Sequence, residues 1–330
     1  MSQQSDTSSD GGVRSAVVVN PTKVDAAQLR NTVTRALADA GWPEPLWYET
    51  TVEDPGRGQA QQAVEAGVEV VFVCGGDGTI LSCVNALAGT DVAMAVLPVG
   101  TGNLLAANLG LSGDVAAGIE VAIERGRRLL DVGVVDNQVF TVMAGMGFDA
   151  QMLAATSETT KARIGWPAYL VGAVRHLRDR PMRVSIRVDE NPPLRRRART
   201  VLVANVGRLQ GGVRLLADAE PDDGYLDVAI LTPRTIGQWA QLLWGVLNRH
   251  KRVPQMEVFR CRRVQITSNR RQPRQLDGDL ITPDKALRAH IRPKALWLCV
   301  PEPAEAPDLA VDAESVTERG ARRVERVHGE

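Results

Sequence analysis

The 330-residue chain is poor in several features, and each shortage excludes a class of protein. Its four cysteines, at positions 74, 83, 261 and 299, form no CxxC pair, so neither a zinc ribbon nor a thioredoxin-like site is indicated. No apolar run approaches the roughly 20 residues that span a bilayer. The polar first 12 residues lack the apolar core of a secretory signal. These shortages predict a cytoplasmic protein.

An excess of charge of either sign is lacking too. Lysine and arginine together number 39, aspartate and glutamate together number 39, and only five of the basic residues are lysines. Proteins that bind nucleic acid usually carry a basic excess, so no nucleic-acid partner is expected. Aromatic residues make up 4% of a chain that is 44% hydrophobic. At roughly 150 residues per domain, its length predicts two domains.

Strand and helix patterns alternate over residues 13–130. Apolar, β-branched runs predict strands at 13–19, 46–50, 68–74 and 92–97, and helical spacing predicts helices at 26–40, at 59–66 and from Thr79. This alternation is typical of an α/β domain, in which helices flank a parallel sheet.

Residues 131–300 have a different pattern. Two helices are predicted at 163–177 and 236–247, among short alternating runs at 139–143, 182–188, 199–205, 225–231, 258–267 and 295–300. We expect a mostly antiparallel β domain here. The polar ends, residues 1–12 and 301–330, are predicted to be a disordered leader and a disordered tail.

Two glycine-rich turns each follow a predicted strand and lead into a helix. They are Gly75-Gly76-Asp77-Gly78-Thr79 and Gly100-Thr101-Gly102-Asn103. Ligands of α/β sheets bind at the carboxyl ends of strands, and helix N-termini favour anions. Two such turns in one sheet predict a cradle for a polyphosphate, although either turn alone is equally well explained as a tight turn.

Other phosphate and hydrolase motifs are missing. Leu81 and Leu105 occupy the third glycine position of the dinucleotide fingerprint, and the one match, which begins at Gly145, falls in the β-rich half. No Gly-Lys pair exists to form a P-loop, and GxSxG and HExxH are absent. A Rossmann oxidoreductase is therefore disfavoured.

The turn at residues 75–79 resembles the GGDGT signature of the diacylglycerol kinase-like lipid kinases, which share a superfamily with NAD kinases. Further segments resemble other motifs of that family, in the same order: Asn20-Pro21-Thr22, LPVGTGN at 97–103, FTVMAGMGFDA at 140–150, Asn205 with Gly211-Gly212, Asp223-Gly224-Tyr225-Leu226-Asp227, and Leu276-Asp277-Gly278-Asp279. The resemblance extends over residues 13–300.

The resemblance implies a two-domain fold like that of NAD kinases and diacylglycerol kinases. An α/β nucleotide-binding domain would span 13–130 and a β-sandwich-like lipid-substrate domain 131–300, with the active site between them. The last strand, near 295–300, could return to the first domain. The implied activity is ATP-dependent phosphate transfer to the hydroxyl of a lipid alcohol. The expected reaction converts diacylglycerol to phosphatidic acid, in phospholipid biosynthesis.

The same resemblance assigns residues to the nucleotide. The expected contacts are Asn20, Pro21, Thr22, Lys23, Thr51, Gly75, Gly76, Asp77, Gly78, Thr79, Gly100, Thr101, Gly102 and Asn103. Thr50 is an alternative to Thr51. Asp77 would hold a Mg²⁺ on ATP, because a carboxylate in a phosphate cradle is repulsive without a bridging cation.

The same resemblance assigns two acidic motifs of the second half to the site. Asp277 would take the proton of the lipid hydroxyl as general base, although Asp-Gly by itself favours a hairpin turn. Glu220, Asp223 and Tyr225 would bind a second Mg²⁺ through the carboxylate of Asp223 and main-chain carbonyls of the other two. A turn joining two strands is the alternative there.

Three departures from the family pattern leave the acceptor open. Lys23 stands where a small residue is usual, Asp279 replaces the usual glutamate, and Leu-Leu-Ala-Ala-Asn follows Asn103. A sphingoid base, a ceramide or another lipid alcohol is an alternative acceptor. NAD kinase and a non-catalytic lipid- or nucleotide-binding module remain further alternatives.

A lipid acceptor implies peripheral association with a membrane. Two basic stretches could dock on anionic lipid: Arg195, Arg196, Arg197 and Arg199, and Arg260, Arg262, Arg263, Arg270, Arg271 and Arg274. The two stretches are explained equally well as solvent-exposed residues that pair with acidic neighbours. Residues 166–170 could form an interfacial anchor or simply pack on the β domain. A homodimer is also left open.

Overall fold

The computed structural model describes residues 12–99, 105, 114–147, 181–207, 216, 219–248 and 253–301. The expected turn at 100–103, Gly211-Gly212, the helix at 163–177 with its candidate anchor, and nearly all of the expected leader and tail lie outside the described residues.

The N-terminal half forms an α/β layer structure, as predicted. Four parallel strands lie in the order β4-β3-β1-β2. These strands are β1 (Ser15–Val19), β2 (Leu46–Glu49), β3 (Val70–Gly75) and β4 (Ala93–Pro98). The helices are α1 (Ala26–Asp39), α2 (Arg57–Glu65), α3 (Asp77–Leu87) and α5 (Val115–Ile123).

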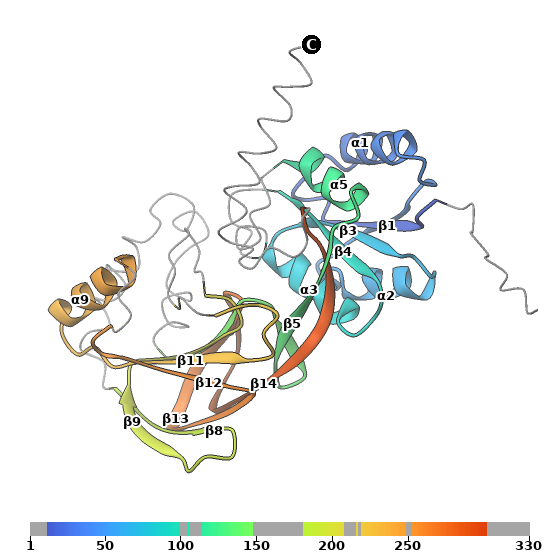
Figure 1. Ribbon diagram of the computed structural model, residues 1–330. Helices are drawn as coiled ribbons and strands as arrows, with labels where there is room; N and C mark the ends of the chain where they lie inside the picture. The colour runs from blue at the N-terminus through green and yellow to red at the C-terminus, as the bar shows by residue number, and fades with distance from the viewer. Residues whose placement is uncertain are drawn as a thin grey trace, which may run out of the picture.

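The helices cover both faces of this sheet (Figure 1). Val17 and Val19 of β1 pack in one core with α1 and α5. Ala16 and Val18, which point the other way, pack in a second core with α2 and α3. A strand buried on both faces reads as a continuous apolar run, which explains why these strands were recognisable in the sequence.

The C-terminal half is an antiparallel β structure with one described helix, α9 (Ile236–Leu247). Its strands are β5 (Arg127–Val135), β6 (Gln138–Phe140), β7 (Met143–Gly147), β8 (Met182–Val188), β9 (Leu194–Ala198), β10 (Thr200–Ala204), β11 (Leu226–Leu231), β12 (Met256–Cys261), β13 (Arg263–Leu276) and β14 (Asp279–Cys299). The two-domain fold class expected from the sequence is confirmed.

The 21-residue strand β14 joins the two halves. Its first part pairs antiparallel with β13, its later part pairs antiparallel with β5, and Leu298 pairs parallel with Met94 of β4. The strands of the described residues therefore form one 14-stranded sheet, and Figure 1 shows β14 running from one half of the molecule to the other. β14 thereby fixes the hairpin at its start relative to the first domain.

Two predicted strands are each divided in the structure. The run at 139–143 bends between β6 and β7, where the N–H groups of residues 141–143 donate to the carboxylate of Asp277. The run at 258–267 is divided at Arg262, where Asp189 accepts from the N–H groups of Arg262 and Arg263. In both cases a distant carboxylate takes the main-chain donors, which local sequence does not reveal. β5, β9 and α5 were not predicted.

None of the helices in the described part of the chain has the length and apolar content needed to cross a membrane.

Candidate active site

Asn20 connects the carboxyl ends of two neighbouring strands, β1 and β3. Its main-chain N–H donates to the carbonyl of Cys74 at 2.8 Å. Its side chain accepts from the hydroxyl of Thr22 at 2.7 Å and donates to the hydroxyl of Thr79 at 3.5 Å. The chain leaves β1 toward β2 on one side and returns to β3 on the other. Asn20 thus lies at the switch point where open α/β sheets bind ligands.

The glycine turn after β3 forms the N-terminus of α3. The cap residue, Gly76, contributes no side-chain hydrogen bond to the first turn, so the N–H groups there are not capped by that residue and favour an anion. A Cβ built on Gly75 would lie 2.7 Å from Cβ of Thr79, whereas a Cβ built on Gly76 would meet no atom within 4 Å. Gly75 is therefore required by packing, while Gly76 borders open space.

The two candidate threonines end β2 at the same edge of the sheet. Thr50 is buried, and its N–H donates to the carbonyl of Val19 at 2.9 Å. Thr51 is exposed, and its hydroxyl accepts from the N–H of Asp54 at 3.1 Å. Lys23 continues the turn after β1, with its N–H donating to the carbonyl of Asn20 at 3.1 Å. Their contacts with a nucleotide stay predictions.

Asp277 lies in a tight hairpin between β13 and β14. Its φ is 46° and that of Gly278 is 96°, as a two-residue type I′ turn requires, and Leu276 pairs with Asp279 across the turn. The hairpin that the dipeptide favours by itself is therefore present. It also holds a buried carboxylate, because Asp277 is only 7% exposed.

Four donors surround that carboxylate. Oδ2 accepts from the N–H and the hydroxyl of Thr141 at 2.7 and 2.8 Å. Oδ1 accepts from the N–H groups of Val142 and Met143 at 2.9 and 2.8 Å. A carboxylate offers about four acceptor positions, so these bonds use them all. Asp277 can take a proton only if it gives up at least one of these bonds.

Burial raises the pKa of the Asp277 carboxyl, and the hydrogen bonds from residues 141–143 oppose that rise. A raised pKa suits a general base, because the ideal value lies near the operating pH. The pKa therefore favours the expected role, whereas the saturated hydrogen bonding does not. The role of Asp277 stays a prediction.

Asp279 brings the second domain to the glycine turn of the first. A Cβ built on Gly78 would lie 3.7 Å from Oδ2 of Asp279. Asp279 is exposed, and Asp77, in the first turn of α3, is partly exposed. The structure therefore unites the turn at 75–79 with the acidic hairpin at 276–279, which lie about 200 residues apart in the chain.

The comparisons with known proteins agree with this architecture. Residues 14–135 match the family described as the diacylglycerol kinase catalytic domain. Residues 141–300 match the YegS C-terminal NAD kinase beta sandwich-like domain. A protein of Chromohalobacter salexigens named "Probable lipid kinase YegS-like" is 31% identical over 252 residues, which cover 74% of this chain and 79% of that protein. The chain belongs to the diacylglycerol kinase-like family of lipid kinases.

A further relative supports this membership, and two solved structures share the fold. A protein of the same name from Pseudomonas fluorescens is 30% identical over 290 residues, covering 83% of this chain and 93% of that protein. A diacylglycerol kinase structure from Bacillus anthracis has a TM-score of 0.65 at 18% identity and covers 88% of this chain and 97% of that one. An NAD kinase of Archaeoglobus fulgidus in complex with ATP has a TM-score of 0.51 at 13% identity and covers 88% and 95%. These two structures show the shared fold.

The turn at residues 220–225, which the sequence predicts to bind a second metal in this lipid kinase, is held by hydrogen bonds. Asp223 accepts from the N–H of Tyr225 at 2.8 Å and from the guanidinium of Arg260. Burial raises the pKa of Asp223, nearby Asp131 and Glu220 raise it further, and Arg260 lowers it. The described residues contain no group of three or more potential ligands placed to hold a metal. Arg260 already supplies positive charge here, and the second Mg²⁺ stays a prediction.

Two elements of the site were not expected from the sequence. Thr141–Met143 hold Asp277, and Asp131 accepts from the N–H groups of Gly224 and Lys294 at 2.6 and 2.7 Å. The sequence does contain a signal for Asp131, a carboxylate within the apolar strand at 129–135. Residues 141–143 offered no such signal, because they act through their main chain.

Proposed function

We propose that this lipid kinase transfers the γ-phosphate of ATP to the hydroxyl of diacylglycerol, which yields phosphatidic acid. The observation that carries the proposal is the contact between domains, in which Asp279 of β14 reaches Gly78 at the N-terminus of α3. Main-chain donors suited to phosphate and a carboxylate suited to a hydroxyl thus lie next to each other. A transfer between two substrates needs both.

The first domain would bind MgATP. The N–H groups of the turn at 75–79 suit the phosphates, and Asn20 holds the end of β1 next to that turn. Asp77 would contact the Mg²⁺ that accompanies ATP, which neutralises charge on the phosphates. The residues at 100–103, outside the described part of the chain, would add the second glycine turn.

The second domain would accept the proton. The oxygen of the lipid hydroxyl bonds to the γ-phosphorus, the bond from that phosphorus to the β–γ bridging oxygen breaks, and ADP leaves. The hydroxyl proton passes to a carboxylate. Asp277 is the residue that the family pattern assigns, while Asp279 is favoured by its exposure and its closeness to Gly78. If Asp279 is the base, Asp277 would be a positioning residue that fixes the hairpin.

Phosphate transfer from labelled ATP to a panel of micellar lipid alcohols and to NAD tests the proposal. We expect labelled phosphatidic acid with wild type. Loss of general-base catalysis typically lowers the rate about 10²- to 10⁴-fold, and we expect a loss of this size with Asp279→Asn. Asp279→Glu, which restores the side chain usual in the family, should recover much of the rate.

The Asp277→Asn variant shows which of the two carboxylates, Asp277 or Asp279, is the general base. If Asp277 is the base, the folded Asp277→Asn protein loses transfer at every pH, and Asp279→Asn keeps most of it. ATP binding and a melting curve are measured for each variant, so that a misfolded protein is not counted. If only a sphingoid base or only NAD is labelled, that compound and not diacylglycerol is the acceptor. No labelling of any acceptor, with ATP still bound, would sink the kinase proposal.

A further inference from the structure

One face of the C-terminal sheet carries a group of arginines. In the antiparallel strands β9, β8 and β13, Arg197 lies opposite Arg183, and Arg195 lies opposite Ser185. Arg187 on the same face of β8 lies opposite Gln265. Because side chains alternate along a strand, the residues between them, such as Val184 and Ile186, point into the core. We call this side of the sheet the arginine face.

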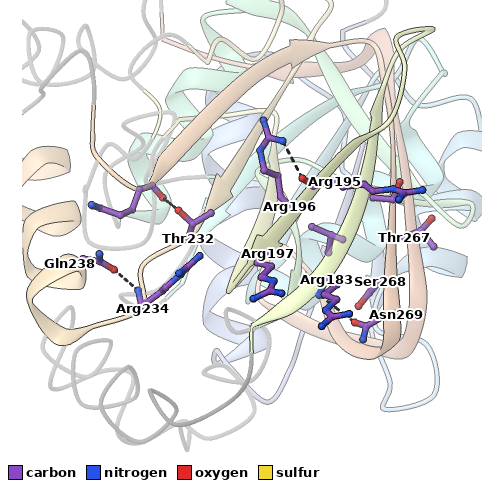
Figure 2. Close-up of a pocket in the computed structure, with 13 residues that line it drawn as sticks. Arg183, Arg195, Arg196, Arg197, Thr232, Arg234, Gln238, Thr267, Ser268 and Asn269 are labelled. Carbon is purple, nitrogen blue, oxygen red and sulfur yellow. Dashed lines mark hydrogen bonds between the residues drawn. The ribbon is translucent and has the colours of Figure 1, made fainter.

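The arginine face borders an open hollow of about 920 Å³ (Figure 2). Arg183, Arg195 and Arg197 line it from the strands, and Arg234 lines it from the segment that leads into α9. None of the described residues that line it is acidic. Figure 1 places β9 and α9 at the end of the molecule away from α3, so the hollow is separate from the candidate active site.

These four arginines differ from Arg196, Arg260 and Arg274, which each pair with a carboxylate. Arg196 forms a two-pronged pair with Glu257 at 2.9 and 3.0 Å, and Arg260 pairs with Asp223. Arg274, which is buried, pairs with Asp136 at 2.6 Å. Among the described residues, no carboxylate lies within ion-pair distance of Arg183, Arg195, Arg197 or Arg234. The hollow therefore gathers four guanidinium groups that no carboxylate of the described residues neutralises, beside the paired Arg196.

That arrangement is unfavourable in the isolated protein. Like charges directly opposite each other on neighbouring strands destabilise a sheet, as Arg183 and Arg197 are placed. The chain as a whole has no net charge, so the positive potential is local. A ligand with several negative groups would relieve the repulsion, and guanidinium groups bind phosphate through two parallel hydrogen bonds.

The residues around the hollow favour an extended anionic surface over a small soluble molecule as the ligand. The arginine face extends beyond the hollow, to Arg187 on β8 and Arg288 on β14, which both pair with Gln265. Helix α9, whose Gln238 lines the hollow, carries Trp244, which is 66% exposed. Exposed tryptophan is typical of membrane–water interfaces. A soluble phosphate ester would occupy the hollow but would not use the rest of the face.

We infer that the arginine face docks the protein on anionic phospholipid headgroups of a bilayer. This inference rests on the proposed function in that docking would bring the enzyme to a lipid acceptor. It goes beyond that function because the docking residues lie outside the active site. Docking would lower the KM for an acceptor presented in an anionic bilayer and leave kcat unchanged.

Co-sedimentation with vesicles of phosphatidylglycerol and phosphatidylcholine tests the inference. Each basic residue near an anionic surface contributes roughly a fivefold factor in affinity. Arg183→Gln combined with Arg197→Gln should therefore weaken binding about 30-fold. The matched control, Arg30→Gln combined with Arg35→Gln on α1, removes the same net charge and should bind as wild type does. Wild-type binding should weaken as salt is raised.

Stability gives an independent check on the variants. Removing two opposed like charges should leave the melting temperature of Arg183→Gln/Arg197→Gln unchanged or raise it. A second pair, Arg195→Gln with Arg234→Gln, should weaken vesicle binding to a similar degree. Equal binding by variant and control, or equal binding to anionic and to pure phosphatidylcholine vesicles, would overturn the inference.

One further measurement, together with the assays already described, separates the remaining outcomes. Saturable binding of glycerol 3-phosphate that is lost in the Arg183→Gln/Arg197→Gln protein would identify a site for a soluble phosphate instead of a bilayer. The vesicle assay needs neither ATP nor turnover, so it can succeed when the kinase assay fails. Kinase activity with no difference in vesicle binding between the variant and its control would sink the docking inference alone.

Discussion

The glycine turn of the first domain and the arginine face of the second both suit phosphate, but by different means. At the glycine turn the donors are main-chain N–H groups at the start of α3, and the side chains are small. At the arginine face the donors are long, exposed side chains on β8 and β9. Main-chain donors are fixed by the fold and position a ligand closely. Guanidinium groups carry a full charge on a long side chain, but their positions are less fixed than those of main-chain groups.

The same contrast appears in how the protein holds its own carboxylates. The main chain binds Asp277, and main-chain N–H groups also hold Asp54 and Asp189. Asp223 is held by the guanidinium of Arg260 as well as by one main-chain N–H group, that of Tyr225. Carboxylates of the first kind sit at chain bends, where unpaired N–H groups are available, whereas Asp223, in the turn before β11, pairs with a side chain of the strand β12. Substitutions at each kind of carboxylate show whether this difference has energetic consequences.

The largest effect is expected at Asp277. Asp277→Asn keeps a residue that tolerates positive φ, but it replaces an acceptor by an NH₂ group that faces N–H donors. Leaving buried donors unpaired should lower the free energy of unfolding by about 3 kcal/mol. Urea unfolding measures this. The control is Asp279→Asn in the same turn, where an exposed change should stay within about 0.5 kcal/mol. Equal losses in the two variants would contradict main-chain anchoring.

A smaller effect is expected at the glycine turn. Gly75→Ala would bring a Cβ within 2.7 Å of Thr79, whereas Gly76→Ala would meet no atom within 4 Å. Overpacking typically costs about 1–3 kcal/mol, so Gly75→Ala should lower the free energy of unfolding by that amount and weaken ATP binding. Gly76→Ala should change stability by less than about 0.5 kcal/mol. A Gly75→Ala protein as stable as Gly76→Ala would show that the turn relaxes freely.

The smallest effect is a pH dependence at Asp223, the carboxylate held by a guanidinium. Burial raises its pKa, and Asp131 and Glu220 raise it further. A carboxyl with a raised pKa favours folding below its unfolded value, about 3.9, and loses that contribution as pH rises through the folded value. The unfolding free energy of wild type minus that of Asp223→Asn should therefore fall from pH 4 upward. A difference that grows with pH would mean that Arg260 outweighs burial.

Much of the first domain could be predicted from the sequence because its strands are buried on both faces. Continuous apolar runs such as 68–74 mark strands without reference to distant residues, and the glycine turn between β3 and α3 lies next to one of them. Less of the second domain could be predicted. Its run at 139–143 looks like one strand, yet a bend divides it because Asp277, more than 130 residues later, accepts the N–H groups there.

The candidate site likewise contains features that the sequence reveals and features that it does not. Asn20, Asp77 and Asp277 were recognisable from motifs of fixed spacing, since each motif is a local turn or helix start. The closeness of Asp279 to Gly78 was not recognisable, because it depends on β14 pairing with both β13 and β4. Arg183 and Arg187 were missed for a related reason, since their charges become one patch only when β8 pairs with β9 and β13.

The sequence by itself determined the family, the order of strands and helices in the first domain, and the chemical types of the site residues. These are local properties, set by hydrophobic periodicity and by turns that few residues can form. Only the tertiary structure decided which carboxylate is buried under four hydrogen bonds and which faces the glycine turn. Only the pairing of distant strands decided which arginines are neutralised by carboxylates and which gather at one hollow. The physical reason is that burial and charge pairing depend on neighbours in space, which strand register sets.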